Sequence, residues 1–205
     1  MRRRISVYLI GLAVAALGIA LVIKSGAGTG PWDTVAVGLH LHLGLTIGTW
    51  AILSQGLLIF VTSIIERKGP QFLSLVVLVV RSLFLDFWLY LVLRNVDFTS
   101  SIGMQWLTFT IGLLLLGTGI GIYLLSKFAA SPVDGLMVAI HQRFGLSFTV
   151  SRIIIEATAV CLGFLLGGPV GLGTIIMALT LGRIVQSSYS LFQKLSNKEQ
   201  QSLSA

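Results

Sequence analysis

The chain has 205 residues, of which 55% are hydrophobic and only 10% are charged. An ordinary soluble domain carries roughly 25% charged residues, and a chain this short has too much surface for its volume to hide so many apolar side chains from water. The composition therefore excludes a soluble enzyme and indicates a protein that crosses the lipid bilayer several times. The net charge of +7 would suggest nucleic acid in a soluble chain, but in a membrane protein it bears on orientation, and we expect no nucleic-acid partner.

Six stretches are apolar enough to form transmembrane helices, each of which needs about 20 largely apolar residues. They cover residues 5–23, 47–65, 72–93, 104–125, 148–166 and 170–192. The polar breaks between them are too short to hold a separate extramembrane domain. The first stretch follows three arginines, as in a signal peptide, but it exceeds the usual apolar core of about 7–15 residues and lacks a clear cleavage site. We expect it to stay as the first membrane helix.

Two further apolar segments, residues 33–43 and 134–144, are about half as long as a span. They are either re-entrant half-helices, which return to the side they entered from, or short buried spans. The positive-inside rule favours half-helices with a cytoplasmic N-terminus, because nine basic residues then lie inside and only Lys24 and Arg94 lie outside. The nine are Arg2, Arg3, Arg4, Arg67, Lys68, Lys127, Arg143, Lys194 and Lys198. If both segments cross fully, Arg67, Lys68 and Lys127 move outside and the bias weakens.

The chain also matches itself: a shift of 101 residues aligns residues 17–50 with residues 118–151 without a gap. Rare residue types coincide in this alignment, namely Pro31 with Pro132, Asp33 with Asp134 and His40 with His141. The chain has only four Pro and three His, so chance is a poor explanation. The pattern predicts a duplication, with one repeat over residues 1–99, a second over 100–192 and a polar cytoplasmic tail over 193–205.

The number of spans decides how the two repeats are related. With re-entrant short helices each repeat holds three spans, so the second repeat enters the membrane from the opposite side. The predicted fold is then an all-α membrane protein of six transmembrane helices and two half-helices, arranged as inverted repeats, as in many secondary transporters. If the short helices cross fully, each repeat has four spans and the repeats are parallel.

Three motifs carry a resemblance to a known family. Residues 25–33 read SGAGTGPWD, residues 130–135 read ASPVDG and residues 171–174 read GLGT. With the chain from Val7 to about Phe192, they resemble the YczE-like bacterial integral membrane proteins, which are related to the YitT group. The resemblance implies a multipass protein of the bacterial cytoplasmic membrane, for which transport is the usual suggestion.

The two Pro-x-Asp breaks form the first candidate site. Its residues are Gly28, Gly30, Pro31 and Asp33 in the first half, with Pro132 and Asp134 in the second. A helix start explains them, because Gly permits close backbone approach, Pro suits a first helical position and Asp suits the first turn. The alternative is a substrate or ion site, since irregular backbone at membrane depth survives only inside protein or along a cavity. There the carboxylates would bind a proton, a cation or a cationic head group.

The ionisable residues within the predicted spans form the second candidate site. They are Arg81, Asp86, Arg152, Glu156 and Arg183. Each is unfavourable in hydrocarbon and should find a partner in the protein interior. Arg152 and Glu156 are four residues apart on one helix, so we expect them to pair. The set is either a charge-neutral packing network or a substrate path, and Arg81 with Arg183 suggests a grip on a carboxylate or phosphate.

No enzyme motif is present, and we expect no metal site and no cofactor, since the single cysteine, Cys161, cannot build a thiolate site. The sequence predicts a small-solute or ion transporter of unknown substrate, with both termini in the cytoplasm. The alternative is a membrane scaffold or accessory subunit of a partner complex. Six short spans are few for a complete transport path, which suggests a homodimer.

Overall fold

The computed structural model describes residues 2–70, 72–126, 128 and 131–204, with the backbone alone for residues 2–3, 148–149 and 195–204. Helices are the only regular secondary structure in these ranges, which confirms the predicted all-α fold class. The helices are α1 (Arg2–Ser25), α2 (Pro31–Leu43), α3 (Ile47–Glu66), α4 (Phe72–Asp86), the π-helix η1 (Phe87–Val92), α5 (Ile102–Leu124), α6 (Pro132–Phe144), α7 (Phe148–Leu165) and α8 (Leu172–Ser204). Lys127, assigned to the inner side from the sequence, lies outside the described residues.

Five helical segments in the described ranges are long and apolar enough to cross a membrane, as expected of a membrane protein. They are Arg4–Ser25, Ile47–Glu66, Phe72–Val92, Ile102–Leu124 and Leu172–Lys194. Each overlaps a span predicted from the sequence. The remaining predicted span, residues 148–166, corresponds to α7, which has 18 residues and is not among the five. α8 continues as a helix to Ser204, through most of the predicted polar tail.

Local capping sets the ends of the short helices. α2 and α6 have 13 residues each and begin at a proline, two residues before the predicted segments, because proline suits the first helical turn. Both end at a glycine with positive φ, 69° at Gly44 and 68° at Gly145, a conformation that glycine adopts without strain. The side chains of Thr46 and Ser147 then accept backbone N–H bonds at the starts of α3 and α7.

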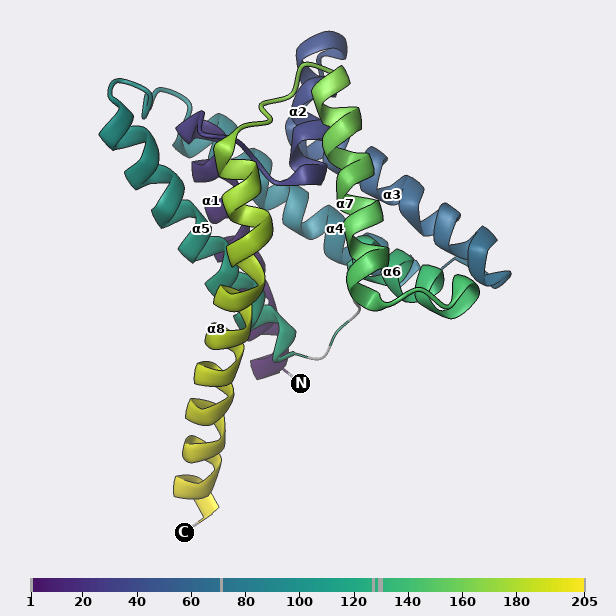
Figure 1. Ribbon diagram of the computed structural model, residues 1–205. Helices are drawn as coiled ribbons and strands as arrows, with labels where there is room; N and C mark the ends of the chain where they lie inside the picture. Colours follow the sequence, from purple (N-terminus) through teal and green to yellow (C-terminus); the bar gives the residue numbers. More distant parts are fainter. Residues whose placement is uncertain (1, 71, 127, 129–130, 205) are drawn as a thin grey trace.

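The most extensive helix contact joins α1 and α5. It depends on glycines that let the two backbones touch, because a Cβ on Gly18 would lie 2.3 Å from the Leu116 nitrogen and one on Gly119 would lie 2.3 Å from the Ala15 nitrogen. Gly11 meets the later part of α5 at Tyr123, whereas Gly18 meets its earlier part. The two helices therefore run antiparallel, as Figure 1 also shows.

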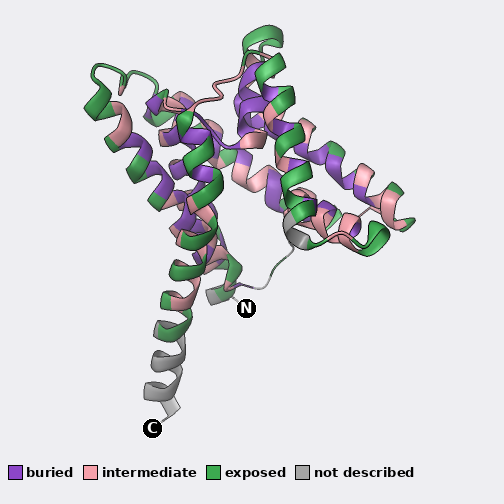
Figure 2. Ribbon diagram, in the orientation of Figure 1, coloured by how far each residue is buried: buried purple, intermediate pink, exposed green. Residues whose placement is uncertain are grey.

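Two groups of helices lie on either side of α4 (Figure 1). α1, α5 and α8 form one group, and α2, α3, α6 and α7 form the other, while α4 contacts both α1 and α3. Buried residues concentrate along α1, α2 and the inner faces of α3, α4 and α5, and the faces of α7 and α8 shown in Figure 2 are largely exposed. α8 packs on α5, whereas α7 packs on α2 and α6. The second half of the chain is thus more open than the first, where α3 packs directly on α4.

Candidate functional site

The break before α2 packs against the turn between α7 and α8. The backbone N–H of Thr29 donates to the Pro169 carbonyl at 3.2 Å, and the Gly173 N–H donates to the Ala27 carbonyl at 2.9 Å. Gly28 has φ 129°, and a Cβ there would lie 2.8 Å from the Thr174 nitrogen, so only glycine fits. The glycine motifs at residues 25–33 and 171–174, found apart in the sequence, meet here.

Asp33 lies at the start of α2, is 9% exposed and has no hydrogen bond to its carboxylate among the described residues. Gly30 leaves room for it, since a Cβ at Gly30 would lie 2.7 Å from Asp33 Oδ2. Gly30 itself provides no side-chain cap to α2. The first Pro-x-Asp break therefore holds a buried acid that no described residue contacts through a hydrogen bond or ion pair, rather than a conventionally capped helix.

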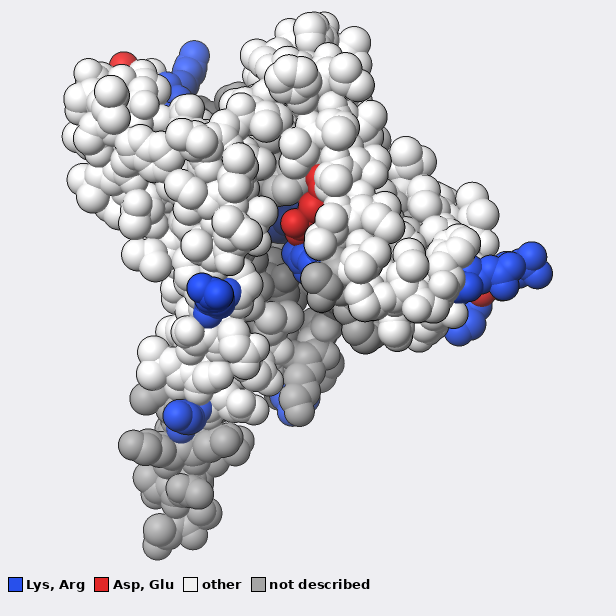
Figure 3. All heavy atoms as spheres, in the orientation of Figure 1, with Lys and Arg blue, Asp and Glu red and all other residues white. Residues whose placement is uncertain are grey.

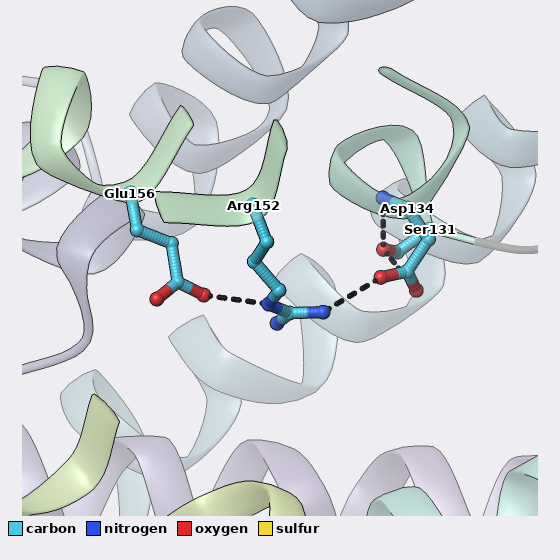
Figure 4. A network of polar contacts seen from close by, with 4 residues as sticks. All are labelled: Ser131, Asp134, Arg152 and Glu156. Carbon is cyan, nitrogen blue, oxygen red and sulfur yellow. Dashed lines mark hydrogen bonds and ion pairs between the residues drawn. The ribbon is translucent and has the colours of Figure 1, made fainter. Parts of the chain in front are cut away.

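The second break is built differently, because Asp134 is held on two sides (Figure 4). Ser131 caps α6 and donates its hydroxyl to Asp134 Oδ2 at 2.9 Å. Arg152 Nη1 lies 3.1 Å from Asp134 Oδ1, and Arg152 Nε lies 2.9 Å from Glu156 Oε1. Arg152 of α7 thus bridges an acid of its own helix and the acid at the start of α6. This links residues that the sequence placed in two separate candidate sites.

The Asp134–Arg152–Glu156 bridge remains accessible. The side chains are 37% exposed at Asp134, 46% at Arg152 and 25% at Glu156. Figure 3 shows a hollow between α8 and the α6–α7 side of the molecule, with acidic and basic atoms inside it and uncharged surface around it. A charged group in contact with hydrocarbon is strongly unfavourable, so this hollow needs water, a ligand or another protein surface to fill it.

A third part of the site was not recognised from the sequence. Tyr123, in the last turn of α5, is partly buried, and the charges of Asp134, Arg81 and Arg152 all act on its phenol. Arg81 also acts on Asp33. An acid of α6 and arginines of α4 and α7 therefore lie near one tyrosine, and the acid of α2 is linked to this group through Arg81. A tyrosine in an apolar span gives no sequence signal of this role, because the partners come from other helices.

Two of the predicted charged residues lie elsewhere. Asp86 accepts hydrogen bonds from Thr46 Oγ1 at 2.5 Å and from the Gly48 N–H at 2.8 Å, at the start of α3. The π-helix η1 follows directly, and the Tyr90 hydroxyl within it accepts the Ile47 N–H at 3.1 Å. Arg183 lies on an exposed part of α8 without an ion pair to any described acid. The structure therefore brings together Arg81, Asp134, Arg152 and Glu156, but neither Asp86 nor Arg183.

The site offers a ligand charged and polar side chains. In the described residues no group of three or more His, Cys, Asp or Glu side chains is close enough to hold a metal ion. His40 and His141 contact the carbonyls of Leu45 and Leu146 through Nδ1, at 2.6 and 2.5 Å, just beyond the ends of α2 and α6. The groups available to a ligand are carboxylates, guanidinium groups and a phenol.

Comparison with known proteins places the chain in a family. A model of the family of unknown function DUF6198 matches residues 2–189. The chain belongs to this family. It is 37% identical over 169 residues to the uncharacterized protein YyaS of Bacillus subtilis, covering 82% of this chain and 84% of that protein. It is 34% identical over 182 residues to the uncharacterized membrane protein YczE of the same bacterium, covering 88% and 83%.

An uncharacterized protein of Haemophilus influenzae is 33% identical over 195 residues, covering 94% of this chain and 86% of that protein. No solved structure matches the chain. The resemblance to YczE-like proteins inferred from the sequence motifs is confirmed. YczE is named as a membrane protein, in agreement with the five long apolar helices among the described residues of this chain.

Proposed function

We propose that this membrane protein transports a small solute or ion and is built from two inverted repeats. Equivalent contacts 101 residues apart support the duplication. Ser25 Oγ donates to the Val22 carbonyl at 2.7 Å, and Ser126 Oγ donates to the Tyr123 carbonyl at 2.6 Å. The bounds of α2 and α6 are separated by the same offset, as are their histidine contacts and their terminal glycines.

The α1–α5 pair supports the inverted arrangement. The repeat offset of 101 residues pairs Gly11 with Gly112 and Gly18 with Gly119. In the structure Gly11 instead approaches Gly119 and Gly18 approaches Gly112, so each glycine of α1 meets the counterpart of the other. Such an exchange is expected when a twofold axis relates the two helices. Because the helices are antiparallel, that axis runs across them and lies in the membrane plane, which is the relation between inverted repeats in secondary transporters.

The proposed orientation follows the basic residues. We place the N-terminus, the α3–α4 turn with Arg67 and Lys68, and the C-terminal tail in the cytoplasm, with Lys24 and Arg94 outside a bacterial cytoplasmic membrane. In this arrangement α1, α3, α4, α5, α7 and α8 cross the bilayer, and α2 and α6 are re-entrant. α7 has 18 residues, which is within the range that a transmembrane helix needs.

The observation that carries the proposal is the exposed Asp134–Arg152–Glu156 bridge beside the start of α6. A permanent packing network would be expected to bury its charges fully, because each exposed charge faces an unfavourable lipid environment. An ion-paired site that opens into a hollow can instead exchange its partners with a solute. Movement of one repeat against the other would then expose the site to each side in turn.

The test measures solute movement and includes variants of the site. Purified protein is placed in lipid vesicles loaded with a small-molecule extract of bacterial cells, and mass spectrometry identifies the solutes that leave. For at least one solute, we expect Asp33→Asn and Asp134→Asn to reduce the rate about tenfold or more, equal to about 1.4 kcal/mol. Asp97→Asn, in the exposed loop after η1, serves as the control and should leave the rate unchanged.

Two outcomes would contradict this proposal. Either no solute leaves faster than from protein-free vesicles, or both site variants transport as the wild type does. The first outcome would favour a scaffold or accessory subunit, an alternative supported by the exposed faces of α7 and α8, and the second would reject the two acids as the transport site. That alternative predicts that a second protein or a second copy of the chain covers these faces, so a substitution such as Leu179→Asn would disrupt a complex.

A further inference from the structure

Arg81 has buried hydrogen-bond donors that no described residue satisfies. Its Nε and Nη2 atoms are both buried and without a partner. The surrounding face of α4 is apolar, since Val77, Val80 and Phe84 pack against Tyr8 and the neighbouring side chains of α1 and α5. Native proteins leave few buried polar groups unsatisfied, and each one calls for an explanation such as a bound ion.

The guanidinium group of Arg81 presents its two unsatisfied donors side by side. Nε–H and Nη2–H lie on the same edge of the planar group, and together they can donate two parallel hydrogen bonds to one carboxylate or phosphate. Arg152 uses its own donors on two acids of the protein, through Nε to Glu156 and Nη1 to Asp134. Arg81 makes no ion pair with any described acid, so its edge is available.

Asp33 does not occupy the unsatisfied donors of Arg81. The charge of Arg81 acts on Asp33, but the two side chains form neither a hydrogen bond nor an ion pair. The charges of Arg81 and Arg152 both act on the Tyr123 phenol. Arg81 and Tyr123 therefore belong with the exposed Asp134–Arg152–Glu156 bridge to one group of residues, called here the central cluster. A ligand bound at Arg81 would therefore lie within reach of the charges that the proposed transport site uses.

We propose that Arg81 binds the oxyanion of a ligand, a carboxylate or a phosphate, through two hydrogen bonds from Nε and Nη2. The inference rests on the proposed function in treating the central cluster as the transport site. In its ionised form Asp33 would repel an oxyanion at Arg81. The oxyanion therefore binds together with a proton or a small cation that neutralises Asp33.

The experiment measures binding directly, without transport. Full-length protein in detergent is equilibrated with millimolar radiolabelled phosphate or acetate, and bound anion is counted after dialysis. Arg81→Lys keeps the positive charge but loses the two-donor edge, and it should weaken binding about tenfold or more. Arg183→Lys makes the same exchange at an exposed arginine of α8 and should bind as the wild type does. Asp33→Asn should tighten binding, because it removes the repulsion.

A lipid head group offers the same chemistry as a free anion, and native mass spectrometry separates the two sources. Phosphatidylglycerol that stays bound to the wild type but not to Arg81→Lys would support the site with a lipid as its occupant. If Arg81→Lys no longer binds free phosphate or acetate, the result would support the site with a soluble ligand as its occupant. The inference is overturned if the wild type binds none of these, or if Arg81→Lys binds as the wild type does.

A second variant tests the inference if Arg81→Lys fails to fold. If Arg81→Lys aggregates, Asp33→Asn decides, since unchanged or weaker anion binding in that variant would contradict the proposed arrangement. The two proposals can fail separately. Anion binding at Arg81 without any solute movement would reject the transport function and keep the site, whereas solute movement that is independent of Arg81 would do the reverse.

Discussion

At the scale of single residues, the same kind of charge serves different purposes at different places. Asp86 accepts two hydrogen bonds at the start of α3 and ties that helix end to the end of α4. Gly48 permits this approach, because a Cβ there would lie 2.6 Å from the Asp86 carboxylate. Asp134 contacts an arginine in an accessible hollow, and Asp33 is buried with no hydrogen bond or ion pair from the part of the chain that the structure describes. Only the last two have properties expected of a binding site.

Asp86→Ala should therefore destabilise the protein rather than alter ligand binding. Loss of the carboxylate leaves the Gly48 N–H without its acceptor and removes the hydrogen bond from the Thr46 hydroxyl to α4, which costs about 1–3 kcal/mol. Thermal unfolding in detergent would measure this as a lower Tm. The matched control is Asp97→Ala, where hydrogen bonds from Thr99 hold the pKa of the exposed carboxyl below its usual range. An equal fall in Tm for both variants would argue against a special role for Asp86.

At the scale of helices, α1 and α5 form the most closely packed pair, whereas α7 and α8 lie apart. Glycines on both α1 and α5 bring the backbones into contact, and α4 and α8 each pack against one member of the pair. α3 closes onto α4, but α7 makes no comparable contact with α8. The difference leaves the hollow of Figure 3 in the second half of the chain.

The glycine contacts predict a sharp contrast between two positions. Gly18→Ala should lower the free energy of unfolding by about 1–3 kcal/mol, because the new methyl group would overlap the backbone of α5. Gly182→Ala, on α8, meets nothing within 4 Å and should be neutral or slightly stabilising, because alanine favours a helix. Unfolding measured by tryptophan fluorescence would compare the two. A tolerated Gly18→Ala would show that α1 and α5 do not touch at this point.

At the scale of the whole molecule, topology and mechanism depend on each other. The antiparallel α1–α5 pair fits inverted repeats, which need the short helices to be re-entrant. Parallel repeats would need α2 and α6 to cross the membrane completely. At 13 residues each, these helices are about 20 Å long, which is short for a hydrocarbon core of about 30 Å.

Reporter fusions near Lys68 and Asp97 test this directly. We expect the Lys68 reporter on the cytoplasmic side and the Asp97 reporter outside, because α4 and η1 join the two positions across the bilayer. Enzymes that are active on only one side of the membrane give the readout. A Lys68 reporter outside the cell would reverse the orientation of α4, make the short helices full spans and replace the inverted repeats with parallel ones.

The sequence by itself determined the features that depend on neighbouring residues. Composition showed a membrane protein, hydropathy located the long helices, and Pro31 and Pro132 marked where the short helices begin. The Arg152–Glu156 pair also follows from local spacing, since residues four apart on a helix share a face. Each of these depends on a stretch of chain that is short enough to read directly.

Only the tertiary structure decided which distant charges meet. It showed that Asp134 pairs with Arg152 and that Asp86 contacts the start of α3. It also showed that Arg183 is exposed and that charged side chains act on Tyr123. It also showed that Arg81 has an unused pair of donors. These relations depend on how helices from both halves cross, and an apolar sequence carries little information about crossing because many apolar faces pack almost equally well.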